Sequence, residues 1–96
     1  GFAGVMETRR AVIFRGQVQG VGFRWTTCRV AQSHCVRGWV RNEPDGTVRC
    51  ELEGDPRQID VFLDAVEHAM DGHVQERVEV SAGDGTIPDE GVEVRR

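Results

Sequence analysis

The residues best suited to chemistry lie in one glycine-studded stretch, Gly-Gln-Val-Gln-Gly-Val-Gly-Phe-Arg, at positions 16–24. An apolar run at 11–14 predicts a strand before it, and a run free of Gly and Pro at 24–33 predicts a helix after it. Such a turn exposes backbone N–H groups beside a helix N-terminus, which carries roughly half a positive charge. We therefore predict that the loop holds a phosphoryl group. The expected donors are the amides of Gln17, Val18, Gln19, Gly20, Val21 and Gly22 and the planar, two-pronged guanidinium of Arg24.

A second candidate is Asn42, which opens the turn sequence Asn-Glu-Pro-Asp-Gly. Its carboxamide offers an acceptor and a donor, so it can orient a water without acting as a strong base. A neutral group suffices only for a substrate with a good leaving group, such as the carboxylate of a carboxyl-phosphate anhydride. We expect catalysis by positioning and electrostatic stabilisation of the phosphoryl group, with no metal, cofactor or covalent intermediate.

Hydrophobic periodicity predicts the elements that must position these groups. The expected segments are a strand around 12–15, a helix at 24–33, strands at 36–41 and 48–53, a helix from its N-cap Asp55 towards Gly72, a strand around 74–80 and a short strand around 92–94. The order β-α-β-β-α-β is typical of a ferredoxin-like α+β sandwich, with two helices on one face of an antiparallel sheet.

This topology would bring the glycine loop and Asn42 together. The first and second strands run parallel with the third between them, so their C-terminal ends share one edge of the sheet. Two strand spacings, roughly 9–10 Å, separate those ends. The loop leaves one end and Asn42 caps the other.

Length and charge restrict the function classes. At 96 residues the chain is one small domain, which we divide into an N-terminal tail, 1–9, and a domain, 10–96. The residues ahead of Met6 lack the regions of a signal peptide, and we treat them as a candidate expression remnant. The net charge of −4 offers no general attraction to nucleic acid or anionic membrane, so we expect neither as a partner. We also expect the protein to be a monomer. All 12 basic residues are arginine, which excludes a Walker-type loop because that loop needs a lysine.

The three cysteines do not suggest a disulfide framework. A helix through Cys28 and Cys35 would separate them by about 10 Å along its axis, beyond the roughly 7 Å that a disulfide spans between Cα atoms. Cys50 falls on the apolar face of a strand, where a thiol behaves as a small hydrophobe. Reduced thiols, and no apolar run long enough to span a membrane, predict a cytoplasmic protein.

The two motifs together resemble the acylphosphatases. The stretch at 16–24 and Gly-Trp-Val-Arg-Asn at 38–42 are both specific, and the resemblance runs from about Val12 to the end. It implies an acyl phosphate as substrate and inorganic phosphate as product or inhibitor, with Arg24 as the phosphate-binding arginine and Asn42 as the water-positioning asparagine. Gln17 departs from the family, which usually carries Arg or Lys there, so one cation near the loop is missing.

Two other interpretations remain. His-Cys-x5-Arg at 34–41 matches the signature of cysteine-dependent phosphatases, in which Cys35 would attack phosphorus, but that loop should open a helix, whereas this stretch alternates like a strand. The second is a non-catalytic ferredoxin-like module that binds an anion, a metabolite or RNA. RNA-binding versions place paired aromatics on the open sheet face, and Trp39 is the only clear aromatic expected there.

Overall fold

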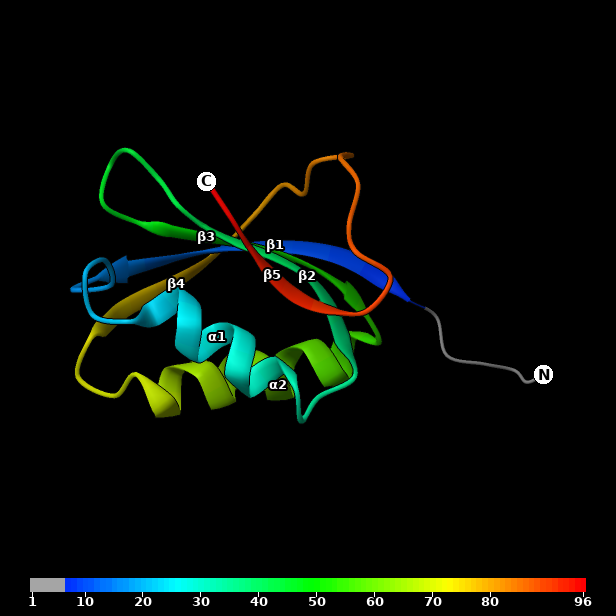
Figure 1. The fold of residues 1–96 in the computed structure, drawn as a ribbon, viewed down its shortest axis with the longest axis horizontal. Coiled ribbons are helices and arrows are strands. Elements are labelled where there is room, and N and C mark those ends of the chain that lie inside the picture. The colour runs from blue at the N-terminus through cyan, green and yellow to red at the C-terminus, as the bar shows by residue number, and fades with distance from the viewer. Residues whose placement is uncertain (1–6) are drawn as a thin grey trace.

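A computed structural model describes residues 7–96, and Figure 1 shows a twisted sheet with two helices packed against one of its faces. The strand order is β4-β1-β3-β2-β5. The elements along the chain are β1 (Thr8–Gly16), α1 (Phe23–Ala31), β2 (Val36–Asn42), β3 (Val48–Gly54), α2 (Pro56–Ala69), β4 (Val74–Val80) and β5 (Gly91–Arg95). The predicted α+β, ferredoxin-like βαββαβ order is confirmed.

The first strand begins earlier than predicted. Thr8 and Arg9, assigned above to the tail, belong to β1 because they pair with Gly54 and Glu53 of β3. Glu7 directly precedes β1, and residues 1–6 of the expected tail lie outside the described residues.

Both helices form where the periodicity predicts them, with differences at their ends. α1 ends at Ala31, two residues before the predicted limit, and the chain continues in turns. Asp55 caps α2 as expected, because its carboxylate accepts a 2.8 Å hydrogen bond from the Arg57 amide. α2 ends at Ala69 and not at Gly72, which adopts a positive φ of 86° in the turn that follows.

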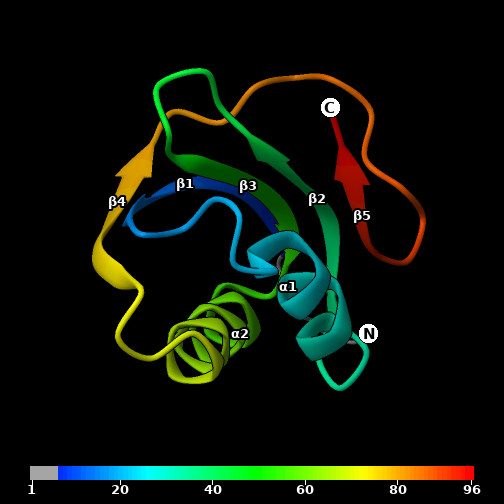
Figure 2. The same cartoon turned by 60° about the vertical axis from the view of Figure 1, so that its left-hand side comes forward.

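The register of β3 fixes the spacing between the ends of β1 and β2. Val48 pairs antiparallel with Phe14 of β1 on one side and with Asn42 of β2 on the other. Asn42 therefore lies two strand spacings, roughly 9–10 Å, from Phe14, two residues before the loop begins. Figure 2 shows β3 between β1 and β2, with both helices on the same side.

The last strand makes the sheet mixed. The three pairings among β4, β1, β3 and β2 are antiparallel, as predicted, whereas β5 pairs parallel with β2. Val94 lies opposite Val40, whose side chain is fully buried on the helix side of the sheet. β5 thus brings its own side chains next to α1, against which it packs.

The core lies between the sheet and the two helices. It includes the inward side chains of β1, β2 and β3 and the helix stripe Ile59, Phe62, Leu63, Val66 and Met70 that the sequence predicts. The rings of Phe14 and Phe23, 5.0 Å apart, join β1 to the first turn of α1. No helix among residues 7–96 combines the length and apolar character that a membrane crossing requires.

The opposite sheet face is covered by the loop between β4 and β5. Its central contact is the carboxylate of Glu51, which is 3% exposed. Glu51 accepts hydrogen bonds from the guanidinium groups of Arg9 and Arg49 and from the amide of Gly83 in the loop. Burial by itself would raise the pKa of Glu51, but these bonds outweigh it and hold the pKa below its ordinary value of 4.5.

We predict that Glu51→Gln lowers the free energy of unfolding at pH 7 by about 1–3 kcal/mol, because it removes hydrogen bonds between charged groups. A depressed folded-state pKa stabilises the protein above the unfolded-state pKa, and that stabilisation is lost as the pH falls through the folded-state value. Urea unfolding should therefore show the gap between wild type and variant closing as the pH falls below 4.5, the ordinary pKa of the carboxyl group.

The matched control is Glu76→Gln, which makes the same substitution in an exposed pair. Glu76 and Arg15 approach to 3.8 Å, and both side chains are more than half exposed. The expected loss is under about 0.5 kcal/mol. If both variants lower the free energy of unfolding equally, or if the effect of Glu51→Gln does not change with pH, the role given to Glu51 is wrong.

Candidate functional site

A cavity of about 420 Å³ lies where the glycine loop, α1, the end of β2 and the end of β5 meet. Gly20 and Gly22 of the loop line it, together with the side chains of Arg24 and Asn42. The two residues predicted to carry the chemistry thus share one cavity, although 18 positions separate them in the chain. The parallel arrangement of β1 and β2 produces this proximity.

The glycine loop is held in place by contacts on three sides. The amide of Gln17 donates a 2.9 Å hydrogen bond to the carbonyl of His73, which precedes β4. The Val18 side chain is 1% exposed and belongs to the core. The Gln19 carboxamide donates 2.8 Å hydrogen bonds to the carbonyls of Glu43 and Thr47 in the β2–β3 turn.

These contacts correct the prediction for Gln17. Its amide was expected to bind phosphate, but it is already occupied by His73. Gln19 has a function that sequence patterns do not show, because its side chain fixes the loop against the turn that follows Asn42. A loop fixed by these three contacts needs little reorganisation when a ligand binds.

The remaining loop amides are free. Among residues 7–96, no protein hydrogen bond is donated by the backbone amides of 18–25, and the first bond into α1 runs from Thr26 to Gly22. Gly22 is the N-cap, with φ of 77°, and it has no side chain to cap the helix. Gly20 has a similar φ of 78°. Glycine therefore lets the chain turn through the left-handed region while the amides stay unpaired beside the positive end of α1.

Arg24 differs from most arginines of the domain because it has no acidic partner among the described residues. Eight others form ion pairs: Arg9, Arg10, Arg15, Arg37, Arg41, Arg49, Arg77 and Arg95. Arg24 is half-buried in the first turn of α1, where the helix has no acidic residue. Its charge is therefore available to a ligand.

Asn42 presents an unpaired polar atom at the same place. Its Oδ1 is buried and has no hydrogen-bond partner. A buried acceptor without a partner costs free energy unless a water or ligand satisfies it. Asn42 is the last residue of β2, and its neighbour Arg41 turns to Glu43 and to the ring of Trp39 instead.

The cavity also contains residues that the sequence analysis missed. Trp25 and Cys28 line it from α1, and Val94 and Arg96 line it from the end of β5. Trp25 and Cys28 lie three positions apart on the predicted helix, which gives no sign of a cavity, and the parallel pairing of β5 with β2 could not be read from a five-residue strand. Burial raises the pKa of the Cys28 thiol, so this cysteine is a weak nucleophile.

Comparison with known proteins agrees with this geometry. The acylphosphatase family model matches residues 10–91. The chain belongs to the acylphosphatase family. An acylphosphatase of Salinibacter ruber is 42% identical over 90 residues, which cover 94% of this chain and 95% of that protein. The crystal structure of an acylphosphatase from Bacillus subtilis superposes with a TM-score of 0.74 at 28% identity, over 95% of this chain and all of the other.

Some relatives match over a shorter region. An acylphosphatase of Thermococcus kodakarensis is 54% identical over 48 residues, which cover 50% of this chain, and the match spans about half of that relative's length, 53%. The predicted family and fold are confirmed. The roles of individual residues rest on the geometry of this chain.

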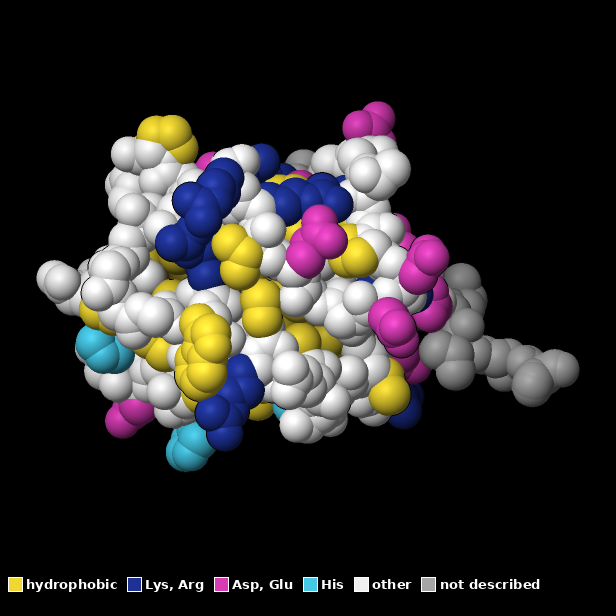
Figure 3. Space-filling view, viewed as in Figure 1, with side chains coloured by type: hydrophobic (Ala, Val, Ile, Leu, Met, Phe, Trp, Pro, Cys, Tyr) yellow, Lys and Arg dark blue, Asp and Glu magenta, His cyan; other side chains and the backbone are white. Residues whose placement is uncertain are grey.

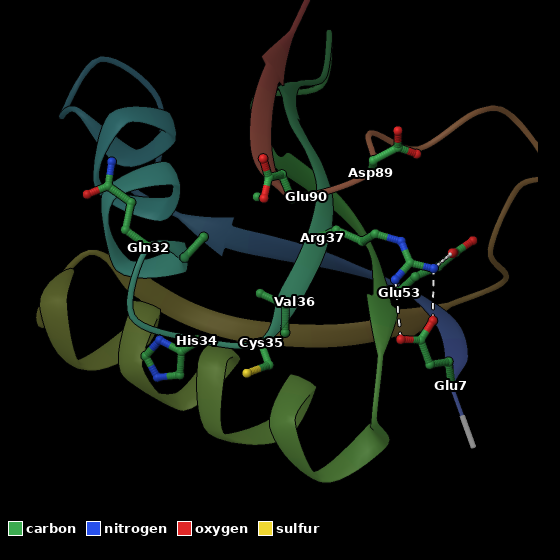
Figure 4. A pocket seen from close by; sticks show the side chains of 11 residues that line it. Glu7, Gln32, His34, Cys35, Val36, Arg37, Glu53, Asp89 and Glu90 are labelled. Atoms are coloured by element: carbon green, nitrogen blue, oxygen red, sulfur yellow. Dashed lines mark hydrogen bonds and ion pairs between the residues drawn. The ribbon is translucent and has the colours of Figure 1, made fainter. Parts of the chain in front are cut away.

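The structure disfavours the cysteine-phosphatase interpretation. Cys35 lies in a second cavity of about 500 Å³, which four carboxylates line, those of Glu7, Glu53, Asp89 and Glu90. Figure 4 shows Arg37 extending away from Cys35 to its ion pairs with Glu7 and Glu53. A cavity with this charge would repel a phosphate dianion.

The backbone of the motif is equally unsuitable. Val36–Asn42 is strand β2, so Arg41 lies six residues from Cys35 along an extended chain, about 20 Å away. A phosphate-binding loop must curl so that both residues reach one anion. The acylphosphatase motifs place the phosphate site at the loop before Arg24, whereas the His-Cys-x5-Arg pattern would place it at Cys35. The geometry supports the loop.

The RNA-binding interpretation also lacks support in the described part of the chain. The loop anchored by Glu51 crosses the open sheet face, which single-stranded RNA would need. Trp39 on that face is 6% exposed, and the guanidinium groups of Arg41 and Arg95 lie 4.7 and 5.5 Å from its ring. It offers no free surface on which a base could stack.

We predict that Cys35→Ser retains the hydrolysis of benzoyl phosphate within about twofold, because the exposed thiol lies outside the cavity of Arg24 and Asn42. The check is the initial rate of each protein. Circular dichroism first establishes that the same fraction of each is folded. A nucleophilic Cys35 would instead lose activity by a factor of ~10⁴ or more.

Proposed function

We propose that this chain hydrolyses the carboxyl-phosphate bond of acyl phosphates to a carboxylate and inorganic phosphate. The observation that carries the proposal is the meeting of the unpaired Arg24, the unsatisfied Oδ1 of Asn42 and the free loop amides in one cavity. The family supports the acyl phosphate as substrate class. The direct test is release of inorganic phosphate from benzoyl phosphate in the presence of EDTA.

In this mechanism the amides of Val18 to Gly22 and the guanidinium of Arg24 bind the phosphoryl oxygens. The fork of the arginine contacts two oxygens at once, and the amides surround the others at the positive end of α1. One arginine–phosphate pair would gross about 4 kcal/mol near the surface, before desolvation is subtracted. Gln17 is left out of the binding set, because its amide donates to His73.

Asn42 would position the water that attacks phosphorus. Its Oδ1 accepts a hydrogen bond from the water and directs a lone pair of the water oxygen towards the phosphorus. The new P–O bond forms as the bond between phosphorus and the acyl oxygen breaks, and the electron pair of that bond leaves with the carboxylate. The water proton passes to the phosphate product or to solvent, so no protein acid is required.

Two properties of the whole molecule belong to the same proposal. The first is a monomer as the active form, since the glycine loop, Arg24 and Asn42 of a single chain already share one cavity. Cys28, Cys35 and Cys50 are all free thiols, which supports the expected cytoplasmic location. Size-exclusion chromatography with light scattering tests the first of these.

We predict that Asn42→Ala lowers kcat for benzoyl phosphate by about 100-fold, since the attacking water loses its orientation. The competitive inhibition constant of inorganic phosphate should stay within about threefold, because Arg24 and the loop amides are unchanged. Steady-state kinetics with phosphate as inhibitor measures both. If phosphate binding weakens as much as kcat falls, Asn42 binds the phosphoryl group instead of positioning water.

We predict that Arg24→Lys raises the inhibition constant of inorganic phosphate and lowers kcat/KM, each by about 10–100-fold, because a point charge cannot replace the two-pronged donor. The control is Arg57→Lys, the same substitution at an exposed residue of α2. The backbone amide of Arg57, and not its guanidinium, donates the hydrogen bond to Asp55. The control should behave as wild type. An unchanged inhibition constant in Arg24→Lys would remove Arg24 from the site.

A further inference from the structure

The cavity extends beyond the groups that would hold a phosphoryl group. Its other wall consists of Trp25 and Cys28 from α1 and Val94 from β5. Because Val94 lies opposite Val40 in the parallel pairing, its side chain projects to the helix side of the sheet and faces α1. We call these three residues the apolar wall. At about 420 Å³ the cavity has the size of a small-molecule site, and a phosphoryl group alone would not fill it.

Two residues of the apolar wall, Trp25 and Val94, are among the exposed large hydrophobic side chains of residues 7–96. The described large hydrophobic side chains with high exposure are Val21 (38%), Trp25 (64%), Val61 (53%) and Val94 (44%). Trp25 and Val94 line the cavity, and Val21 lies in the loop between its lining residues Gly20 and Gly22. Single exposed hydrophobic residues are ordinary, but a group of them around one cavity indicates a binding surface.

The ring of Trp25 is held where a ligand could pack against it. The guanidinium of Arg29, one turn further along α1, lies 5.3 Å from the ring centroid. This contact restricts the ring without filling the cavity, since Arg29 does not line the cavity. An indole offers a large flat surface that favours stacking with another aromatic group.

The charged side chains that line the cavity are all positive in the described part of the chain. Arg24 and Arg96 line it, and no aspartate or glutamate does so within residues 7–96. Figure 3 shows a group of arginine side chains directly beside a row of hydrophobic ones over α1 and β5. A matching ligand is anionic at one end and apolar at the other, with no positive charge.

We propose that the acyl group of the substrate packs against the apolar wall, so that the enzyme selects apolar, aromatic-sized acyl phosphates over short ones. This inference rests on the proposed function, because the phosphoryl group must lie at Arg24 and the loop for its acyl substituent to reach Trp25 and Val94. Trp25 and Val94 then determine specificity, whereas Arg24 and Asn42 act on the phosphoryl group of any acyl phosphate.

The test compares kcat/KM for benzoyl phosphate and acetyl phosphate in wild type, Trp25→Ala and Val94→Ser. Wild type should prefer benzoyl phosphate, and Trp25→Ala should reduce the ratio of the two values by about tenfold, mainly through KM for benzoyl phosphate. Val94→Ser should reduce it by roughly threefold. The inhibition constant of inorganic phosphate, which has no acyl group, should change by less than twofold.

Two controls separate the possible outcomes. Trp25→Phe keeps an aromatic ring and should retain most of the selectivity. Val61→Ala removes a hydrophobic side chain of α2 whose exposure lies between those of Trp25 and Val94, outside the cavity, and should leave the ratio unchanged. An unchanged ratio in Trp25→Ala, with both substrates still hydrolysed, overturns the acyl site alone. Failure of the wild-type protein to hydrolyse either substrate overturns the proposed function itself.

Discussion

The ladder of hydrogen bonds that β3 forms with both of its neighbours is the constraint on which the candidate site depends. Because β3 runs antiparallel to β1 and to β2, those two strands must run parallel and end at the same edge. Val48 sets the alignment, since it pairs with Phe14 on one side and Asn42 on the other. A shift of one residue in the β2–β3 ladder would turn Asn42 to the opposite face of the sheet and away from Arg24.

A second requirement is that the loop be rigid while its amides stay unpaired. The protein meets it by fixing the loop through other groups: the core side chain of Val18, the Gln17 amide on His73 and the Gln19 carboxamide on the β2–β3 turn. Phe23, packed on Phe14, fixes the start of α1 in the same way. The donors are thus positioned before any ligand arrives, which is the arrangement that electrostatic catalysis favours.

The sequence predicts the element order, the fold class and the two residues that meet in the cavity, because glycine spacing and alternation of apolar residues are local signals. It does not predict that Gln17 would be occupied by His73, since that bond joins residues 56 positions apart. The wall formed by Trp25, Cys28 and Val94 was missed for the same reason. Only the parallel pairing of β5 with β2 brings Val94 to α1, and a strand of five residues does not reveal its partner.

The order of strands in the sheet also has a consequence for the newly synthesised chain. The three central strands, β1, β3 and β2, are complete by Gly54, while both edge strands come from the C-terminal part. The sheet can therefore be assembled from its centre outwards as the polypeptide leaves the ribosome. The groups that we propose to bind the phosphoryl group all precede β5 in the chain. A nascent chain lacking its last strand would therefore already contain them, and of the residues that line the cavity it would lack Val94 and Arg96.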